Sequence, residues 1–536
     1  MNYTDFDKTA AFQTLAALAA NAQAFDLAAM LNMERVKASV TPMAAGLSYS
    51  WAAKAMDSDT LAALQALADE QELIAKYRAI LDGETMNTGE NRKVLHHLLR
   101  GQLGKAVMRD SLDGHPVDIG IFYKRELERF GAFAESIHSG KLKGSTGKPF
   151  KAVAQIGIGG SDLGPRALYI ALDNWAVAEG KKKLTAAFIS NVDPDDSATV
   201  AASLPLEETL FVLVSKSGTT QETLANELFI KDKLAKAKLD PSKHIAAVTS
   251  ETSPLAHNPA YLDSFYIDDF IGGRYSSSSA VGGVILSIAF GPDVFKDLLA
   301  GAHEADKQAL EPNALKNAAL LDALIGVWER NFLGYPYTAI LPYSQALARF
   351  PAHLQQLDME SNGKRVNRFG KPVAYSTGPV VFGEPGTNGQ HSFYQLLHQG
   401  TDIVPLQFIG FDESQRGDDV LVDGSSSQTK LKANLAAQIV AFAKGKADSN
   451  GNKEFTGSRP SSLIYGKKLT PKTLGSLLAH FENKVMFQGL IWNLNSFDQE
   501  GVQLGKVLTK KVLAAKTGGS TGDAALDAYG EILGVN

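Results

Sequence analysis

The stretch LFVLVSKSGTTQETL, residues 210–224, decides the fold class because it joins a buried strand to a helix. Its first five residues are all apolar, which is the pattern of a strand buried on both faces. A short turn rich in serine and threonine follows, and helix-compatible sequence comes after the turn. A strand that passes through a short turn into a helix is the repeating unit of a parallel sheet. We therefore expect an α/β protein.

The same alternation of strand-like and helix-like sequence extends over most of the chain in two series. The first series surrounds the opening stretch with FKAVAQIGI (150–158), LTAAFIS (184–190), HIAAVTS (244–250) and DSFYIDD (263–269). The second contains YPYTAILPYS (335–344), GPVVFGEPG (378–386), TDIVPLQFIG (401–410) and SSLIYGK (461–467). Each run has the length of a buried strand, and helical sequence separates most of them. This pattern predicts two doubly wound parallel-sheet domains.

The two ends of the chain differ from this middle part. Residues 1–105 space their apolar side chains as helices do, and strand-like alternation is scarce there. The last residues also read as helical. We therefore expect four parts: an N-terminal helical segment at 1–105 that packs on the larger domain, a smaller α/β domain at 106–285, a larger α/β domain at 286–505 and a C-terminal helical arm at 506–536.

Composition narrows the class of partner. The 536 residues carry a formal net charge of −5, whereas proteins that bind nucleic acid or anionic lipid usually have a basic excess. The longest strongly apolar stretch, GGVILSIAFG (282–291), is far shorter than the ~20 residues of a membrane span. Acidic residues precede the first apolar helix, where a secretory signal has basic ones. We expect a cytoplasmic protein with a small soluble partner, no nucleic acid and no membrane.

Absence of cysteine excludes disulfides, thiolate metal sites and a cysteine nucleophile. The eleven histidines are scattered through the chain rather than grouped with carboxylates at metal-ligand spacing. We therefore expect no metal and no cofactor.

Two strand-to-helix turns suit an anion, because free amides and the helix dipole favour negative charge at a helix start. The first, QIGIGGSDLGPRAL (155–168), ends its strand with Gly157, Gly159 and Gly160 and places Ser161 and Asp162 before the helix. Glycine allows a backbone to approach a ligand closely, but its spacing here is not the dinucleotide-binding pattern. A ligand site and a tight structural turn are equally compatible with this sequence.

The second turn follows the opening strand and offers hydroxyls and a cation. Ser215, Lys216, Ser217 and Thr220 could satisfy a phosphate with charge-assisted and neutral hydrogen bonds. The alternative is an N-terminal cap alone, since Thr219 and Glu222 have the spacing of a capping box. A cap needs one hydroxyl and the turn supplies four. In a nucleotide P-loop the lysine follows a longer Gly-rich turn than the one found here. We therefore expect a small phosphate ester rather than a nucleotide.

Two further segments contain charged candidates. In DDFIGGRYSSSSAVGG (268–283), Gly272 and Gly273 precede Arg274, whose planar and permanent charge suits an oxyanion. A salt bridge between domains is the alternative. In QQLDMESNGK (355–364), Glu360 can be a catalytic base or a helix-capping residue, and the neighbouring residues do not decide between them.

These segments together resemble the phosphoglucose isomerase family. The resemblance runs from about residue 85 to 512 and is carried, in order, by NTGENRKVLHHLLR (87–100), IGIGGSDLGP (156–165), SKSGTTQET (215–223), DFIGGRYSSSSAVG (269–282), QQLDMESNGK (355–364), GEPGTNGQHSFYQLLHQG (383–400) and GVQLGKVLTKKV (501–512). It implies two sugar-isomerase (SIS) domains and a homodimer that needs no metal. The implied activity is the aldose–ketose isomerisation of D-glucose 6-phosphate and D-fructose 6-phosphate, in glycolysis and gluconeogenesis.

The resemblance also implies a role for each matching residue. Ser215, Lys216, Ser217 and Thr220 would hold the phosphate, and Gly160, Ser161, Gly273, Gln356 and Gln499 would contact the rest of the sugar phosphate. The implied catalytic residues are Glu360 as base, Arg274 beside the developing enediolate, and His391 with Lys506 for ring opening. In the family the neighbouring subunit donates the histidine.

The implied chemistry fits these residue types. One carboxylate placed over two adjacent carbons can take a proton from carbon 2 and return it at carbon 1, through a cis-enediol(ate). A fixed cation stabilises the negative charge of that intermediate. His398 could share a helix face with His391, whereas we interpret His96 and His97 as structural.

The sequence departs from the family in one segment, and two other functions compete with the implied isomerase activity. Ser217 and Gly218 stand where animal members of the family carry threonine and phenylalanine, which leaves discrimination between sugar epimers open. A dual glucose and mannose 6-phosphate isomerase is therefore one rival. A catalytically silent sugar-phosphate sensor is the other, although a sensor needs no base, acid or pair of cations.

Overall fold

The computed structural model describes residues 1–21, 25–110, 114–516 and 519–535. The chain divides into two compact units, Met1–Ser496 and Phe497–Asn536. Parts of the predicted N-terminal helices (residues 22–24) and of the predicted arm (517, 518 and 536) lie outside the described residues. No helix within the described ranges is long and apolar enough to cross a membrane.

The first series of strand-like runs forms a five-stranded parallel sheet, as the sequence predicts. Its strands are β7 (Ala152–Ile156), β8 (Thr185–Ile189), β9 (Thr209–Val214), β10 (Ile245–Thr249) and β11 (Ser264–Tyr266), in the order β11-β10-β9-β7-β8. β7 pairs with both β8 and β9, with Ala152 opposite Thr185 and Thr209. Nearly every residue of β7, β9 and β10 is buried, which explains their continuous apolar sequence.

The second series forms the parallel part of a six-stranded sheet. Its strands are β12 (Tyr337–Tyr343), β13 (Val380–Phe382), β14 (Leu406–Phe411) and β17 (Ser461–Gly466), in the order β17-β14-β12-β13. Both predicted parallel sheets are thus confirmed. In each sheet the second strand lies on one side of the first strand and the third lies on the other side. The strand order therefore reverses between β7 and β9 and between β12 and β14. Ligands of such folds bind outside the carboxyl ends of the strands at this point.

The N-terminal segment contains helices, as predicted, but its described residues also form four short strands, β1 to β4, that the sequence did not indicate. Its helices are α1 (Ala10–Ala19), α2 (Leu27–Met30), α3 (Met33–Ala38), α4 (Ser58–Glu70) and α5 (Leu73–Leu81). The strands β1 (Val40–Pro42) and β2 (Ser48–Ser50) add to the edge of the second sheet, where β2 runs antiparallel to β17. Three residues each are too few for an alternating pattern to stand out. Pairing holds them in place, because β2 pairs with β17 and β1 pairs with β2.

The remaining elements connect and cover the two sheets. Before β7 come β3 (Thr85–Asn87), β4 (Arg92–Lys93), η4 (His96–Leu99), β5 (Met108–Asp110), β6 (Pro116–Asp118) and α6 (Ile119–His138). Helices of the first sheet and its exit are α7 (Leu163–Ala178), α8 (Pro194–Ser203), α9 (Gln221–Lys236), α10 (Ala280–Phe290), α11 (Pro292–Gln308) and α12 (Ala318–Val327). The second sheet adds α13 (Phe350–Asn362), α14 (Tyr394–Gln399), β15 (Leu421–Val422), β16 (Ser425–Ser426), α15 (Ser427–Lys444) and α16 (Pro471–Ile491).

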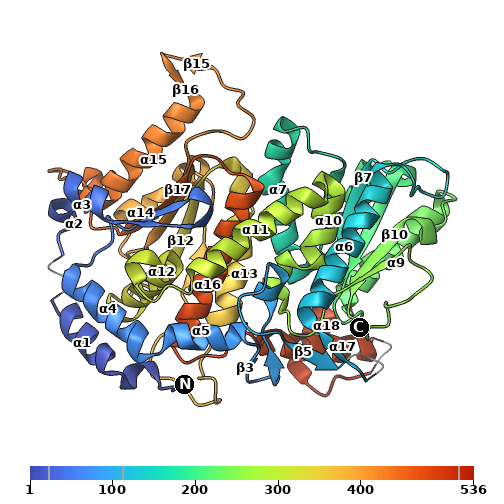
Figure 1. Cartoon of the computed structure of the whole chain (residues 1–536), viewed down its shortest axis with the longest axis horizontal. Helices are drawn as coiled ribbons and strands as arrows, with labels where there is room; N and C mark the ends of the chain where they lie inside the picture. Colours follow the sequence, from blue (N-terminus) through green and yellow to red (C-terminus); the bar gives the residue numbers. More distant parts are fainter. Residues whose placement is uncertain (22–24, 111–113, 517–518, 536) are drawn as a thin grey trace. The chain divides into compact units, whose positions relative to one another are not determined.

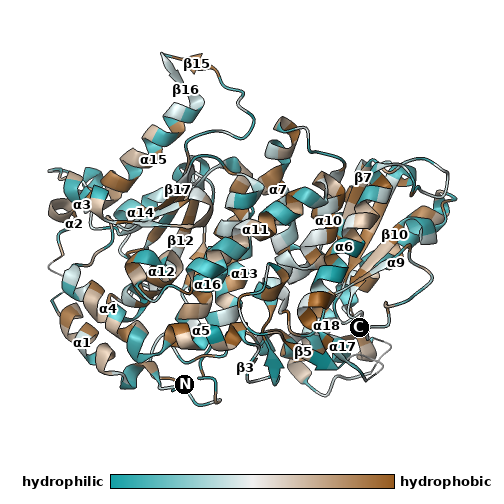
Figure 2. Ribbon diagram, in the orientation of Figure 1, coloured by the Kyte–Doolittle hydropathy of each residue, from teal (hydrophilic) through white to brown (hydrophobic). Residues whose placement is uncertain are grey.

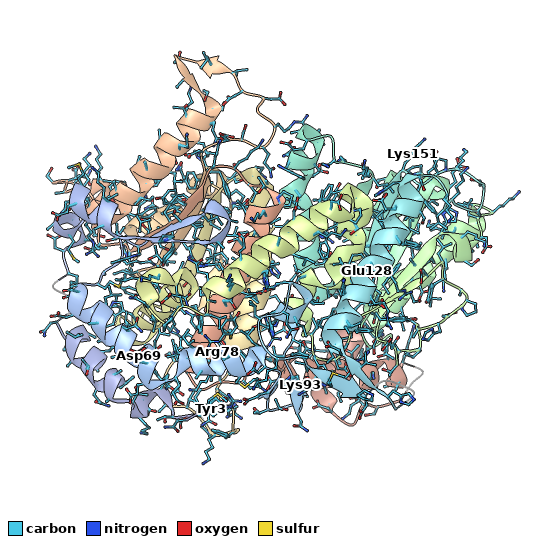
Figure 3. All side chains as sticks on the ribbon, in the orientation of Figure 1. Tyr3, Asp69, Arg78, Lys93, Glu128 and Lys151 are labelled. Carbon is cyan, nitrogen blue, oxygen red and sulfur yellow. The ribbon has the colours of Figure 1, made fainter. Side chains whose placement is uncertain are left out.

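Helices from both halves of the first unit meet between the sheets (Figure 1). α7 packs against α10 of its own half and against α13 and α16 of the other. Every residue of α10 is buried, as is nearly every residue of α16. Hydrophobic residues concentrate in the strands, for example β7 and β12 (Figure 2). Side chains fill the spaces between these layers, while Asp69 of α4 and Glu128 of α6 are exposed (Figure 3).

The second unit contains the predicted C-terminal helices. They are α17 (Gln503–Ala515) and α18 (Ala524–Ile532), which contact each other. Several large apolar side chains of this unit are exposed, among them Leu504 on α17 and Ile532 on α18. The division of the whole chain into four parts at residues 105, 285 and 505 stays a prediction.

Candidate active site

Three turns of the first sheet meet at its carboxyl edge. They follow β7, β9 and β11, and because these strands are parallel their carboxyl ends lie at one edge. The turn after β11 leads into η8 (Gly273–Ser278), which contacts both the Gly-rich turn after β7 and helix α13. A Cβ atom on Gly160 would overlap the backbone carbonyl of Gly273. Glycine at residue 160 is therefore required by a direct contact between two of the predicted site segments.

The Gly-rich turn also borders α13. Gly159 has φ +60°, a conformation that favours glycine, and a Cβ there would lie 3.5 Å from Nε2 of Gln356. Ser161 follows in the short η5 helix (Gly159–Ser161), and its carbonyl accepts a hydrogen bond of 2.8 Å from the buried Gln155. The turn is thus tight for structural reasons and also lies next to the Gln356 side chain.

The hydroxyl-rich turn after β9 is held together by its own side chains. Ser215 Oγ donates to Thr220 Oγ1 at 3.1 Å, and Ser217 Oγ accepts from the backbone amide and hydroxyl of Thr219 at 3.3 and 3.0 Å. The predicted capping box of Thr219 and Glu222 is wrong. Helix α9 begins one residue later, with Thr220 as its N-cap, and the Thr220 side chain makes no capping hydrogen bond. The hydroxyls of this turn therefore do not serve as the helix cap.

Lys216 connects this turn to the segment that carries Arg274. Its Nζ donates to the carbonyl oxygen of Ile271 at 3.1 Å and lies 3.9 Å from Asp269. Burial lowers the pKa of the Lys216 ammonium, and the carboxylate of Asp269 opposes this shift. A phosphate dianion at this turn would favour the charged ammonium.

Arg274 and Glu360 form an ion pair across the two halves of the first unit. The Nη1 of Arg274 lies 3.0 Å from Oε1 of Glu360, although the two residues are 86 positions apart in the sequence. The Arg274 side chain is fully buried, whereas that of Glu360 keeps 22% of its surface exposed. A buried fixed cation thus faces a carboxylate that solvent or a ligand can reach.

Gln356 binds the other oxygen of the same carboxylate. Glu360 lies in the last turn of α13 and Gln356 one turn earlier, so the two side chains share a helix face. Gln356 Nε2 donates to Oε2 of Glu360 at 2.9 Å. The negative end of the helix dipole opposes an anion at this position, and the Arg274 charge offsets that effect. Both carboxylate oxygens are consequently held in a defined orientation.

Three residues that the sequence did not single out support this pair. Ser361 Oγ accepts from Nε of Arg274 at 2.7 Å, and the carbonyl of Ser496 accepts from its Nη2 at 2.6 Å. Ser496 Oγ in turn donates to Asn362 at 2.7 Å. Ser361 and Asn362 directly follow Glu360, which is the only signal in the sequence for their role.

The histidines separate into exposed and buried groups. His391 is exposed on the loop after β13, at the end of η12 (Asn388–His391). His398 instead stacks on Phe442 with ring centroids 3.7 Å apart and contacts Gln438 at 3.0 Å, and burial lowers its pKa. The same loop segment therefore presents His391 to solvent and uses His398 for packing.

His96 and His97 are buried in η4, in agreement with a structural role. Burial lowers the pKa of both, with that of His97 at about 3, so both are neutral at physiological pH. His96 stacks on Tyr275 with ring centroids 4.6 Å apart, which brings it next to the Arg274 segment.

Gln499 and Lys506 belong to the second unit. Gln499 is partly exposed, and Lys506 is exposed on the first turn of α17. Their place beside Glu360 stays a prediction. Within the described ranges, no group of three or more His, Cys, Asp or Glu side chains is arranged to hold a metal ion.

Known proteins match this chain along nearly its whole length. The matching protein family is described as Phosphoglucose isomerase, and the match spans residues 50–528. A glucose-6-phosphate isomerase of Treponema pallidum is 60% identical over 534 residues, covering 99% of this chain and 98% of the relative. One of Treponema denticola is 62% identical over 502 residues, covering 94% and 93%. The crystal structure of a glucose-6-phosphate isomerase from Chlamydia trachomatis D/UW-3/Cx has a TM-score of 0.90 and 41% identity, covering 99% of this chain and 100% of that one.

Proposed function

The chain belongs to the phosphoglucose isomerase family and has its activity, EC 5.3.1.9, and we propose that it interconverts D-glucose 6-phosphate and D-fructose 6-phosphate by ring opening and proton transfer through a cis-enediolate. The observation that carries this mechanism is the Arg274–Glu360–Gln356 arrangement. It joins a reachable carboxylate to a buried permanent cation. These are the two groups that a proton-transfer route between adjacent carbons requires.

Glu360 acts as the base in this proposal. Its carboxylate takes the proton from carbon 2 of the open-chain aldose, and the electron pair of that C–H bond forms the carbon–carbon double bond of the enediolate. The electron pair of the carbon 1 carbonyl moves onto its oxygen, which then takes the proton of the carbon 2 hydroxyl. The same carboxyl returns a proton to carbon 1, and the carbonyl re-forms at carbon 2. The contacts of Glu360 with Arg274 and Gln356 support this role, because they fix both oxygens while the group stays partly exposed.

Arg274 stabilises the oxyanion of the enediolate. An arginine keeps its charge at every working pH, and a charge fixed in a buried site needs no rearrangement when the substrate becomes negative. Its side chain is fully buried, and Ser361, Ser496 and Glu360 bind three of its nitrogen atoms. Electrostatic stabilisation by a preorganised group is usually a large term in catalysis.

The substrate phosphate binds at the turn after β9. Ser215, Ser217 and Thr220 would donate hydrogen bonds and Lys216 would contribute charge. The position of this turn supports the assignment, since it lies where the sheet changes direction and where ligands of such folds bind. Gly160, Ser161 and Gly273 would line the path from the phosphate to Gln356, because the two glycine segments contact each other there.

Ring opening involves His391 and Lys506, with His391 donated by a second subunit of a homodimer. The histidine side chain can exchange a proton near neutral pH. His391 is exposed on the loop after β13. The loop after β14, a strand of the same sheet, contains β15. Three apolar residues of this loop, at 420–422, are exposed. An exposed apolar segment at the same sheet edge supports a subunit contact near His391.

The names of the relatives also support a place in glycolysis and gluconeogenesis, and with it a cytoplasmic location. The substrates of this reaction are phosphorylated sugars, and the enzyme therefore works where such sugars are formed and consumed.

Isomerisation in deuterium oxide tests the proton-transfer route. We expect deuterium at carbon 2 of glucose 6-phosphate or carbon 1 of fructose 6-phosphate during turnover of the unmodified enzyme. The variant Glu360→Gln should incorporate no deuterium above the uncatalysed rate, because an amide cannot accept the proton. Complete absence of label from the product of the unmodified enzyme would favour hydride migration instead.

Activity on mannose 6-phosphate is a second candidate function. A Cβ on Gly218, which has φ +66°, would meet Ser253, so this turn closes on a glycine where animal members carry an aromatic ring. In this proposal the absence of an aromatic ring from the turn weakens discrimination between sugar epimers. The turnover of mannose 6-phosphate relative to glucose 6-phosphate measures the effect.

A further inference from the structure

We propose that Ser361 is a positioning residue: its hydroxyl, joined to that of Tyr275, holds the Arg274 guanidinium in register with Glu360. This inference rests on the proposed role of Arg274 in the isomerase reaction. It assigns a specific task to a serine that has no contact with the reacting carbons in the proposal and that acts only through the arginine.

The geometry places Ser361 at the centre of a short polar chain. Its Oγ accepts from Nε of Arg274 at 2.7 Å and lies 2.9 Å from the hydroxyl of Tyr275. A serine hydroxyl can accept two hydrogen bonds, so it can serve both neighbours at once. Burial raises the pKa of Tyr275 to about 12, and the tyrosine therefore keeps its proton throughout the working range.

Each edge of the guanidinium has a different function. Nη1 faces Glu360, whereas Nε and Nη2 bind Ser361 and the carbonyl of Ser496. The Tyr275 ring lies 5.5 Å from the guanidinium carbon and is itself stacked against His96. The interior edge is thus fixed by groups that do not titrate near neutral pH, and the remaining edge points to the base.

The residues around Arg274 can change the position of its guanidinium but not its charge. Its charge does not vary with pH, so the stabilisation of the enediolate depends on the distance and direction of the Nη1 edge. A fully buried guanidinium that loses an acceptor at Nε must rotate toward another partner, because an unpaired charged donor in the interior is unfavourable. Small displacements of a catalytic group lower rates strongly.

The first test compares two buried serines on different helices. Ser361→Ala removes the acceptor of Arg274, and we expect kcat to fall about ten- to a hundred-fold while the inhibition constant of inorganic phosphate stays unchanged. The matched control is Ser476→Ala, which removes a buried hydroxyl that donates to the carbonyl of Ala44 at 3.0 Å. Its kcat should equal that of the unmodified enzyme. A matching loss in both variants would mean a general effect on packing and would overturn the proposal.

The second test asks whether Ser361 acts through Arg274. In an Arg274→Lys background no Nε is present, so Ser361→Ala should cause no further fall in kcat. The same fall in both backgrounds would show that Ser361 acts independently of the arginine, and this would also overturn the proposal. Tyr275→Phe should lower kcat less than Ser361→Ala, and the double variant should not be worse than Ser361→Ala alone.

The two tests also separate this inference from the proposed mechanism. If Arg274→Lys by itself left kcat unchanged, the proposed role of the arginine would be wrong. If Arg274→Lys lowered kcat but Ser361→Ala did not, the mechanism would stand and only the positioning role of Ser361 would fail. Thermal denaturation of each variant shows whether the compared proteins are equally folded.

Discussion

Helix α13 carries two carboxylates, and they lie in opposite environments. Glu360 faces the turns of the first sheet, where Arg274 and Gln356 bind both of its oxygens. Asp358, two residues earlier, points about 200° away around the helix, into the interior of the other half. It lines a cavity of about 30 Å³, and its Oδ1 has no hydrogen-bond partner among the residues that the structure describes. One helix thus separates a candidate base from a buried acid.

The interior region is also rich in charge, but its charges neutralise one another. Asp322 accepts from Tyr49 and Gln407 at 3.0 and 2.7 Å, and Lys484 lies 3.2 Å from it. The charge of Lys484 and the contacts with His480 and Gln407 overcome the effect of burial and hold the pKa of Asp322 well below its usual range. The same cavity is bordered by Lys54 and Glu329, which form an ion pair at 2.9 Å.

A strongly shifted pKa is often a guide to a functional site, but here it points to the interior. Burial raises the pKa of Asp358 to about 6 and that of Glu482, beside Arg100, to about 7. Neither group lies where the turns after β7, β9 and β11 meet. We therefore select Glu360 as the candidate base from its contacts rather than from the size of a pKa shift. Changing the two regions separately should affect activity in one case and stability in the other.

The largest effect is expected for Glu360→Gln. Loss of the base should lower kcat by about 10³- to 10⁴-fold, because general base catalysis has about that magnitude. Steady-state assays with fructose 6-phosphate measure the loss. The urea midpoint should fall less than in a variant of a fully buried ion pair, since the Glu360 side chain is partly exposed and Ser361 and Ser496 still bind Arg274. A variant that retained more than a tenth of the activity would remove Glu360 from the mechanism.

A substitution among the charged interior residues around Asp322 should lower the stability of the fold rather than the activity. Asp322→Asn leaves Lys484 buried without its anion, and removing one partner of a buried ion pair costs about 3–5 kcal/mol. The midpoint of urea unfolding should fall accordingly. The kcat of the protein that remains folded should equal that of the unmodified enzyme, and a selective loss of kcat would connect the cluster to catalysis.

Arg274→Lys tests the active-site pair from its other side. We expect kcat to fall about 10²- to 10³-fold, the range for loss of an oxyanion-stabilising group, because a lysine cannot reproduce the three-sided contacts of the guanidinium. Asp322→Asn is the comparison variant. Equal kcat in Arg274→Lys and the unmodified enzyme would contradict the proposed role.

The smallest effect is expected for Asp358→Asn, which should raise the stability of the fold rather than lower it. The folded-state pKa of about 6 lies above the ordinary value of 3.8, so the folded protein binds this proton more tightly and loses stability as pH rises from about 4 to 6. Two pKa units correspond to about 3 kcal/mol at most. The variant should therefore be more stable than the unmodified enzyme, by about 1–3 kcal/mol at pH 8.

Urea midpoints of the two proteins at pH 4 and pH 8 measure this difference. At pH 4 the gain should nearly vanish, because Asp358 is then protonated in the folded state. A constant difference at both pH values would mean that the titration of Asp358 does not contribute, and a loss of kcat would place Asp358 with the active-site group.

Much of the fold could be predicted because strands and helices depend on neighbouring residues. Continuous apolar runs such as residues 210–214 identify the parallel strands correctly. Strands β1 and β2 were missed, since such three-residue strands exist only through pairing, of β2 with β17 and of β1 with β2. The capping box at Thr219 failed for a related reason: the sequence permits a cap at two adjacent residues, and packing of the turn selected Thr220.

The candidate site was predictable as a set of residues but not as an arrangement. Motifs indicated Arg274, Glu360 and Gln356, whereas the sequence assigned no role to Ser361, which lies in the Glu360 motif, or to Ser496. Their roles come from contacts such as that of Arg274 with Ser496, 222 residues away. The sequence singled out His391, but the packing of His398 against Phe442 comes only from the tertiary structure.

The sequence by itself determined the order of strands, turns and helices and the types of chemical group at each turn, because these properties depend on residues within about ten positions of one another. Only the tertiary structure decided which carboxylate of α13 faces Arg274 and which is shut into the interior. Burial, dielectric surroundings and hydrogen-bond partners arise from segments far apart in the chain, and they exist only once those segments have packed together.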